Sequence, residues 1–194
     1  MKINLTKSLS LIVSRPIQFI SNNEPQLELI LGKDHRVIIP NLPQGFRLIV
    51  YSPEKESGLY NLLNRAGISL SRGELRMALT ACLPDGCFIV EDDRGNVISS
   101  MMARHINSND RLFSGRIDWL ATDPDFNGLG LGTIAASAAA KRLQDAGYDD
   151  IWVTTDDHRL GAIKVFYNIG FRPYIYDEIE TRWEKILQKL KLVK

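Results

Sequence analysis

Apolar residues recur at helical spacing in five stretches of the chain. These stretches are residues 53–67, 71–83, 131–147, 159–170 and 178–194. In the third, one stripe carries Leu131, Ala135, Ala139, Leu143 and Ala146. Because residues three or four apart share one face of a helix, this spacing predicts five amphipathic helices. Gly147 and Gly170 follow the third and fourth stretches and are typical helix stops.

Strand-like segments lie between these helices. Residues 46–52, 115–123, 150–157 and 172–177 are short and rich in β-branched or aromatic residues, and residues 86–105 read as two strands joined at "DDRGN", a turn composition. The alternation of strands and helices predicts an α/β domain with a mixed sheet, of the α+β kind, over residues 46–177.

The two ends of the chain differ from this central part. Residues 1–45 contain β-leaning pieces, "QLELIL" and "RVIIP", among four prolines and are expected to form an N-terminal arm or added strands. Residues 178–194 are expected to form a C-terminal helix packed on the domain, with acids first and lysines last. A second interpretation of this helix, a contact in a homodimer, stays open.

Composition and charge narrow the function classes. Lys and Arg number 24 against 23 Asp and Glu, so the net charge of +1 gives no reason to expect a nucleic-acid or membrane partner. No stretch approaches the roughly 18 apolar residues of a membrane span, and the start lacks a signal-peptide core, which favours a cytoplasmic protein. Cys82 and Cys87 do not form a disulfide or zinc framework, and no metal site is expected.

Three alternating glycines form the most informative segment, "DFNGLGLGT" at residues 125–133. Gly128, Gly130 and Gly132 lie between a predicted strand and a predicted helix. Backbone N–H groups in such a loop can turn toward one point, where the start of the helix adds partial positive charge. The segment therefore predicts an anion site that a diphosphate can approach closely.

Two phosphate-binding motifs fit this loop poorly. Gly130, Gly132 and Ala135 match the Rossmann spacing of a dinucleotide-binding oxidoreductase, but "DPDFN" separates the strand from the glycines, and only about sixty residues follow for the remaining strands. A nucleoside-triphosphate P-loop requires a lysine that is absent here.

A longer stretch resembles a known family. "IDWLATDPDFNGLGLGT" followed by "VTTDDHRLGAIKVFYNIGFRPY", residues 117–133 and 153–174, resembles the GNAT superfamily of acyl-CoA N-acyltransferases. The matching pattern is strand, proline, glycine loop, helix, strand and an Ala…Tyr…Gly-Phe element, here Ala162, Tyr167, Gly170 and Phe171. "TDDHRLGAI" also resembles a mycothiol-synthase-like branch of that superfamily. The resemblance implies the GNAT fold and acetyl transfer from acetyl-CoA to a primary amine of a small molecule or peptide.

The resemblance also implies site residues. Backbone and side chains expected to bind the cofactor are Leu120, Ala121, Thr122, Asn127, Gly128, Leu129, Gly130, Leu131, Gly132, Thr133 and Arg159. Two of these depart from the family pattern: Asn127 replaces an Arg or Gln, and Arg159 replaces a frequent asparagine.

Two residues are expected to be catalytic. Tyr167 is the expected proton donor to the leaving thiolate, although Phe166 competes for that register. Asp118 is the expected base, on the strand that carries the thioester, with residues 156–158 as alternatives. Two alternatives to an acetyltransferase remain. The first is a non-catalytic acyl-CoA-binding module, and the second is the dinucleotide-binding oxidoreductase.

Overall fold

A computed structural model describes residues 20–21, 24–108, 111–176 and 179–192. Its strands are β1 (Ile20–Ser21), β2 (Glu24–Pro25), β3 (Leu27–Leu31), β4 (Phe46–Val50), β5 (Cys82–Asp92), β6 (Val97–Ser108), β7 (Arg111–Thr122), β8 (Ile151–Thr155) and β9 (Phe171–Pro173). Its α-helices are α1 (Glu56–Arg65), α2 (Arg72–Thr80), α3 (Leu131–Asp145), α4 (Leu160–Asn168) and α5 (Glu180–Lys189), and two 3-10 turns are η1 (Pro53–Lys55) and η2 (Pro124–Phe126).

Seven strands form the central sheet, in the order β4-β5-β6-β7-β8-β3-β9. Neighbours pair antiparallel except β7 and β8, which run parallel. This mixed sheet confirms the predicted fold class and excludes the Rossmann alternative, whose sheet is mostly parallel. The glycine loop lies between β7 and α3.

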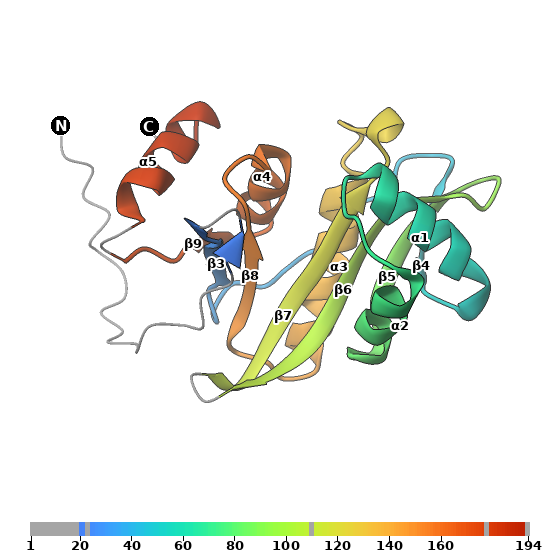
Figure 1. Ribbon diagram of the computed structural model, residues 1–194, viewed down its shortest axis with the longest axis horizontal. Helices are drawn as coiled ribbons and strands as arrows, with labels where there is room; N and C mark the ends of the chain where they lie inside the picture. The colour runs from blue at the N-terminus through green and yellow to red at the C-terminus, as the bar shows by residue number, and fades with distance from the viewer. Residues whose placement is uncertain (1–19, 22–23, 109–110, 177–178, 193–194) are drawn as a thin grey trace.

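Helices cover both faces of the sheet (Figure 1). The alanines of α3 let that helix lie close to β5, β6 and β7, where Ala135, Ala139 and Leu143 are fully buried. On the other face, α1 and α2 bury Leu59, Leu63 and Leu75. The start of α2 is fixed by a capping box between Ser71 and Glu74.

The segment before residue 46 contributes to the sheet interior. β3 pairs with β8 from Leu27↔Thr155 to Leu31↔Ile151 and with β9 on its other edge. Part of the expected arm is thus an added strand between β8 and the edge strand β9, while residues 1–19 lie outside the described residues. "RVIIP" was expected to lean toward β structure, but it forms no strand, because Val37 packs in the core and its N–H bonds the Gln144 side chain of α3.

The C-terminal segments are shorter than the sequence pattern suggests. β9 runs from Phe171 to Pro173 and so overlaps the strand expected over residues 172–177 only at its start, and α5 ends at Lys189. Trp183 and Ile186 of α5 are buried in the main core. Arg182 also ties this helix to the loop after β8 through an ion pair with Asp157.

Candidate functional site

The glycine loop has an open concave backbone. Gly128 and Gly130 have φ angles of +85° and +79°, which side chains rarely adopt, and nothing lies within 4 Å of a Cβ built on either. No described residue accepts a hydrogen bond from the N–H groups of residues 128–133. The glycines are therefore required by backbone conformation, and the loop presents unpaired donors to solvent.

The start of α3 adds positive charge to this loop. Gly130 is the N-cap and supplies no capping side chain, and the first turn contains no acid. Gly132 allows the helix to approach β7, since a Cβ there would lie 2.9 Å from Thr122 Oγ1. A helix start with free N–H groups and no anionic cap of its own can bind an external anion.

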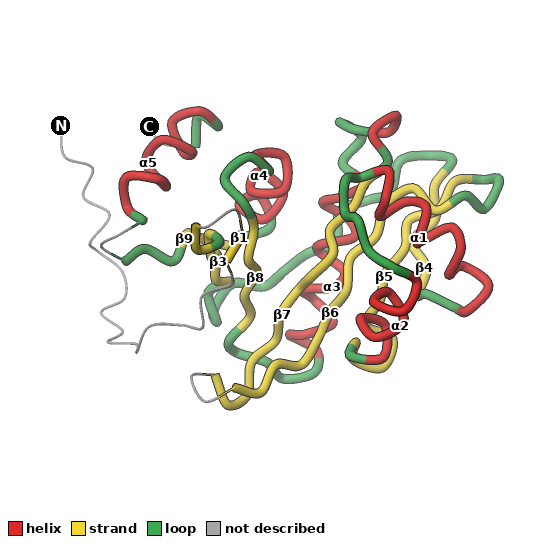
Figure 2. Tube along the Cα trace, in the orientation of Figure 1, coloured by secondary structure: helices red, strands yellow, loops and turns green. Residues whose placement is uncertain are grey.

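β7 and β8 separate beside the loop. Their pairing is restricted to Gly115↔Ile151 and Arg116↔Trp152, although β7 continues to residue 122. Figure 2 shows β8 turning away from β7 toward α4. On its other edge β7 contains a bulge opposite β6. Asp118 pairs with Met102 and Ala121 pairs with Ser100, so two residues of β7 lie opposite one residue of β6, and Trp119 in the bulge has a φ angle of +64°. Beyond Arg116, β7 therefore has no strand partner among the described residues on its β8 edge, although the carbonyl oxygens of Leu120 and Ala121 accept hydrogen bonds from the Arg159 and Ser99 side chains.

A cleft of about 1050 Å³ joins these features. It lies between the glycine loop, the end of α1 and the first turns of α4. The expected cofactor residues that line it are Leu120, Ala121, Thr122, Asn127, Gly128, Gly130, Leu131, Gly132, Thr133 and Arg159. Leu129 does not line it, and its side chain is half exposed. His158, expected only as an alternative base, also lines the cleft, as do Arg65 and Lys164, which were not expected. The positive charges of Arg159 and Lys164 beside free N–H groups suit a diphosphate.

A gap of about 30 Å³ continues from the cleft between the separated strands. Leu120, Arg159 and Ala162 line both spaces. Asp118 and Thr154 come from the sheet face opposite α3, and Phe166 comes from α4. The gap therefore extends from the cleft toward the opposite face of the sheet and marks the point where the two strands separate.

Tyr167 lies outside both spaces. It lines neither the cleft nor the gap in the described part of the chain, and the Arg172 guanidinium stacks on its ring at 4.2 Å. Phe166, one residue earlier, is buried and lines the gap. The position of Tyr167 gives no support to its expected role as proton donor, which remains a prediction.

Asp118 lies at the gap, but arginines occupy both of its carboxylate oxygens. Arg104 Nη1 is 3.0 Å from Oδ2, and Arg116 Nε is 2.6 Å from Oδ1. The carboxylate is buried, and its negative charge is compensated by these two cations.

Two of the three alternative bases already have polar partners within the protein. Asp156 accepts a hydrogen bond from Gln26 Nε2 at 3.0 Å, and Asp157 pairs with Arg182. Asp156 and His158 line the cleft. His158 therefore remains within reach of a ligand in the cleft.

Glu28 is a buried acid that was not predicted from the sequence. It lies on β3 opposite Thr154 of β8, buried beside Arg111. Burial raises the pKa of its carboxyl group to about 7, although Arg111 acts in the opposite direction. The available signal was a single acid within the apolar run "LELIL".

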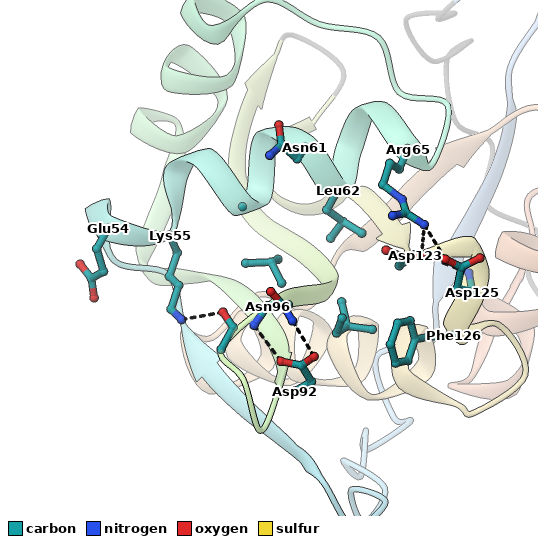
Figure 3. Close-up of a pocket in the computed structure, with 14 residues that line it drawn as sticks. Glu54, Lys55, Asn61, Leu62, Arg65, Asp92, Asn96, Asp123, Asp125 and Phe126 are labelled. Carbon is teal, nitrogen blue, oxygen red and sulfur yellow. Dashed lines mark hydrogen bonds and ion pairs between the residues drawn. The ribbon is translucent and has the colours of Figure 1, made fainter.

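A second cavity of about 470 Å³ adjoins the cleft (Figure 3). It lies between α1, the β5–β6 turn and η2, and shares Arg65 and Phe126 with the cleft. Arg65 Nη2 points to Asp123 and Asp125, at 2.8 Å from each carboxylate (Figure 3). These ion pairs fix Arg65 at the boundary between the two cavities.

Two further features concern metals and membranes. In the described ranges, no three His, Cys, Asp or Glu side chains are grouped as metal ligands. Of the helices that the structure describes, none has the length and apolar character needed to span a membrane.

Structural comparison identifies similar folds. A GCN5-related N-acetyltransferase from Sphaerobacter thermophilus aligns with a TM-score of 0.64 at 16% identity, covering 78% of this chain and 50% of that one. The ribosomal-protein-S18-alanine N-acetyltransferase from Escherichia coli aligns with a TM-score of 0.56 at 16% identity, covering 67% and 79%. At these identities the likeness concerns the fold.

Sequence comparison adds relatives and a family. Mycothiol acetyltransferases of Saccharomonospora viridis and Pseudarthrobacter chlorophenolicus are 23% and 26% identical over 68% and 74% of this chain. The chain spans about half the length of these curated relatives, 47% and 45%. The family model described as "Acetyltransferase (GNAT) family" matches residues 57–171, more than half of the chain. The chain therefore belongs to the GNAT acetyltransferase family.

Proposed function

We propose that this chain transfers an acetyl group from acetyl-CoA to a primary amine. The observation that carries the proposal is the continuity of three features: the unpaired N–H groups of residues 128–133, the cleft and the gap between β7 and β8. The first suits a diphosphate, the cleft has room for the pantetheine arm, and the gap lies where the thioester end of that arm would meet the separated strands. The residues present fit coenzyme A.

In the proposed reaction, the N–H groups of the glycine loop hold the diphosphate, and the unpaired edge of β7 holds the arm. Backbone N–H groups near Leu120 and Ala121 donate to the thioester oxygen as negative charge develops on it. The amine attacks the carbonyl carbon directly. Holding the amine and the thioester in line supplies much of the rate acceleration.

The amine must be neutral when it attacks. Asp118 is proposed as the group that orients it, since this carboxylate lies at the gap on the face away from α3. Asp118→Asn is expected to lower kcat/KM for the amine while acetyl-CoA affinity changes little. An unchanged kcat/KM would exclude Asp118 from this role.

The acceptor is proposed to be a polar amine. Arg104, Arg116 and Asp118 gather on the sheet face where the gap opens, and Glu28 lies on the neighbouring part of that face. Charged side chains there favour an acceptor with several polar groups. The name of the relatives, mycothiol acetyltransferase, makes the amine precursor of a small thiol one member of the panel to test.

A non-catalytic acyl-CoA-binding module is the second candidate. The observation that favours it is the engagement of both Asp118 oxygens by arginines. Calorimetric titration with acetyl-CoA, followed by a thiol-release assay over a panel of amino sugars, amino acids, polyamines and peptides, separates the two functions. Thiol release that depends on one class of amine supports the enzyme. Tight binding without release on the whole panel supports the module, and absence of binding contradicts both.

A further inference from the structure

Thr155 carries a buried hydroxyl group that makes no hydrogen bond to any described residue. It is the last residue of β8 and is 3% exposed. Its Oγ1 has no hydrogen-bond partner among the described residues. Buried hydroxyl groups are nearly always paired in folded proteins, because desolvation without a partner is costly. A partner outside the protein chain would satisfy Thr155.

The hydroxyl lies where the proposed thioester must pass. Thr155 lines the gap between the separated strands, together with Leu120 and Phe166. Side chains alternate along β8, so Thr155 shares the α3 side of the sheet with Val153, whereas Thr154 lies on the other side. Thr155 therefore lies on the same side of the sheet as the diphosphate site.

No other side chain near the gap offers a free hydroxyl group among the described residues. Thr154 Oγ1 accepts a hydrogen bond from Arg116 Nη2 at 2.9 Å. Phe166, which α4 places at the gap, has no hydroxyl, and Tyr167 stacks against Arg172 elsewhere. Thr155 is the side-chain hydroxyl group in this lining that has no partner in the described part of the chain.

We infer that Thr155 is a catalytic residue that donates a hydrogen bond to the thioester sulfur as the carbon–sulfur bond breaks. The inference rests on the proposed function. The amine nitrogen forms a bond to the carbonyl carbon, and the sulfur leaves with the bonding electron pair as a thiolate. The proton lost by the nitrogen passes to solvent, and Thr155 keeps its own proton. Its hydrogen bond stabilises the thiolate.

The test compares coenzyme A with desulfo-coenzyme A, in which hydrogen replaces the thiol, by calorimetry. Wild type and Thr155→Ser are expected to prefer coenzyme A by about threefold to tenfold, the worth of one net hydrogen bond. Thr155→Val, which keeps the side-chain volume, is expected to bind the two ligands equally. Ser137→Ala is the matched control, since Ser137 carries another buried hydroxyl without a partner among the described residues but lines neither the cleft nor the gap.

Turnover provides the second measurement. With an accepted amine, Thr155→Val is expected to lower kcat about tenfold and to leave KM for acetyl-CoA within about threefold, because the hydrogen bond strengthens as charge develops. A wild type that binds neither ligand contradicts the proposed function itself. A wild type that binds coenzyme A without preference over the desulfo compound, or a valine variant that keeps the wild-type preference and kcat, overturns the role of Thr155 alone.

Discussion

Arg159 Nη2 donates a hydrogen bond to the carbonyl oxygen of Leu120 at 3.1 Å, across the gap between β8 and β7. Arg159 is the N-cap residue of α4, whereas Leu120 lies on the unpaired edge of β7. One side chain thus links the two walls of the proposed cofactor path. It also brings a positive charge to the cleft, which Arg159 lines.

Arg159→Ala is expected to weaken coenzyme A binding by about fivefold, because it removes a cation near the diphosphate from a partly solvated position. Arg159→Lys is expected to recover part of the loss, since it keeps the charge but loses the planar fork. Calorimetry at low and moderate salt measures both. Tighter binding by Arg159→Ala would mean that the arginine competes with the cofactor for the Leu120 carbonyl.

Gly130→Asp is expected to weaken coenzyme A binding by about tenfold or more, because it adds a negative charge and a side chain where the diphosphate lies. Gly147→Asp is the matched control. Gly147 has a φ angle of +85°, and a Cβ at this position would likewise meet nothing within 4 Å, but it lies beyond the other end of α3. Both variants are expected to lose about 1 kcal/mol of stability through the left-handed backbone. Equal affinities of the two variants would contradict the diphosphate assignment.

Tyr167→Phe is expected to keep kcat within about twofold, because the ring still stacks on Arg172 and the lost hydroxyl lies outside the gap. Steady-state kinetics with the accepted amine, alongside Thr155→Val, compares the two hydroxyl groups directly. A loss of about tenfold or more in kcat for Tyr167→Phe alone would support the tyrosine as proton donor and count against Thr155.

Glu28→Gln is expected to flatten the dependence of stability on pH. Burial raises the pKa of Glu28 from 4.5 to about 7, with Arg111, Arg116 and Asp150 as the charged groups that face it. The folded state then holds this proton more tightly than the unfolded chain, so the free energy of unfolding falls as pH rises from about 4.5 through about 7, by ~3 kcal/mol. Above that range the contribution is constant.

Urea denaturation at pH 5 and pH 8 measures this difference for wild type and Glu28→Gln. Glu180→Gln, which changes an exposed carboxylate at the start of α5, serves as the control and is expected to follow wild type. If Glu28→Gln shows the same pH dependence as wild type, the carboxyl group titrates at its ordinary value in the folded protein.

Local patterns predicted much of the fold and of the cofactor site. The five helices and the glycine loop between β7 and α3 follow from residue types at fixed spacing. The insertion of β3 between β8 and β9 did not, because pairing between Leu27 and Thr155 joins segments far apart in the chain. Strand propensity shows that such a segment leans toward β structure, but not which partner it finds.

The reacting groups were harder to predict for the same reason. Asp118 is identifiable on its strand, but its engagement by Arg104 and Arg116 depends on how β6 and β7 pair. Phe166 and Tyr167 are neighbours in the sequence, and only the rotation of α4 decides which of them reaches the gap. Thr155 has no motif of its own, because its importance comes from the partner that it lacks among the described residues.

Amide hydrogen exchange with and without coenzyme A tests the diphosphate site directly. The N–H groups of residues 128–133, which no described residue pairs, are expected to exchange fast in the free protein and to become protected when the ligand binds. Saturating coenzyme A that leaves exchange in this segment unchanged would contradict the diphosphate site, and with it the proposed acetyl transfer.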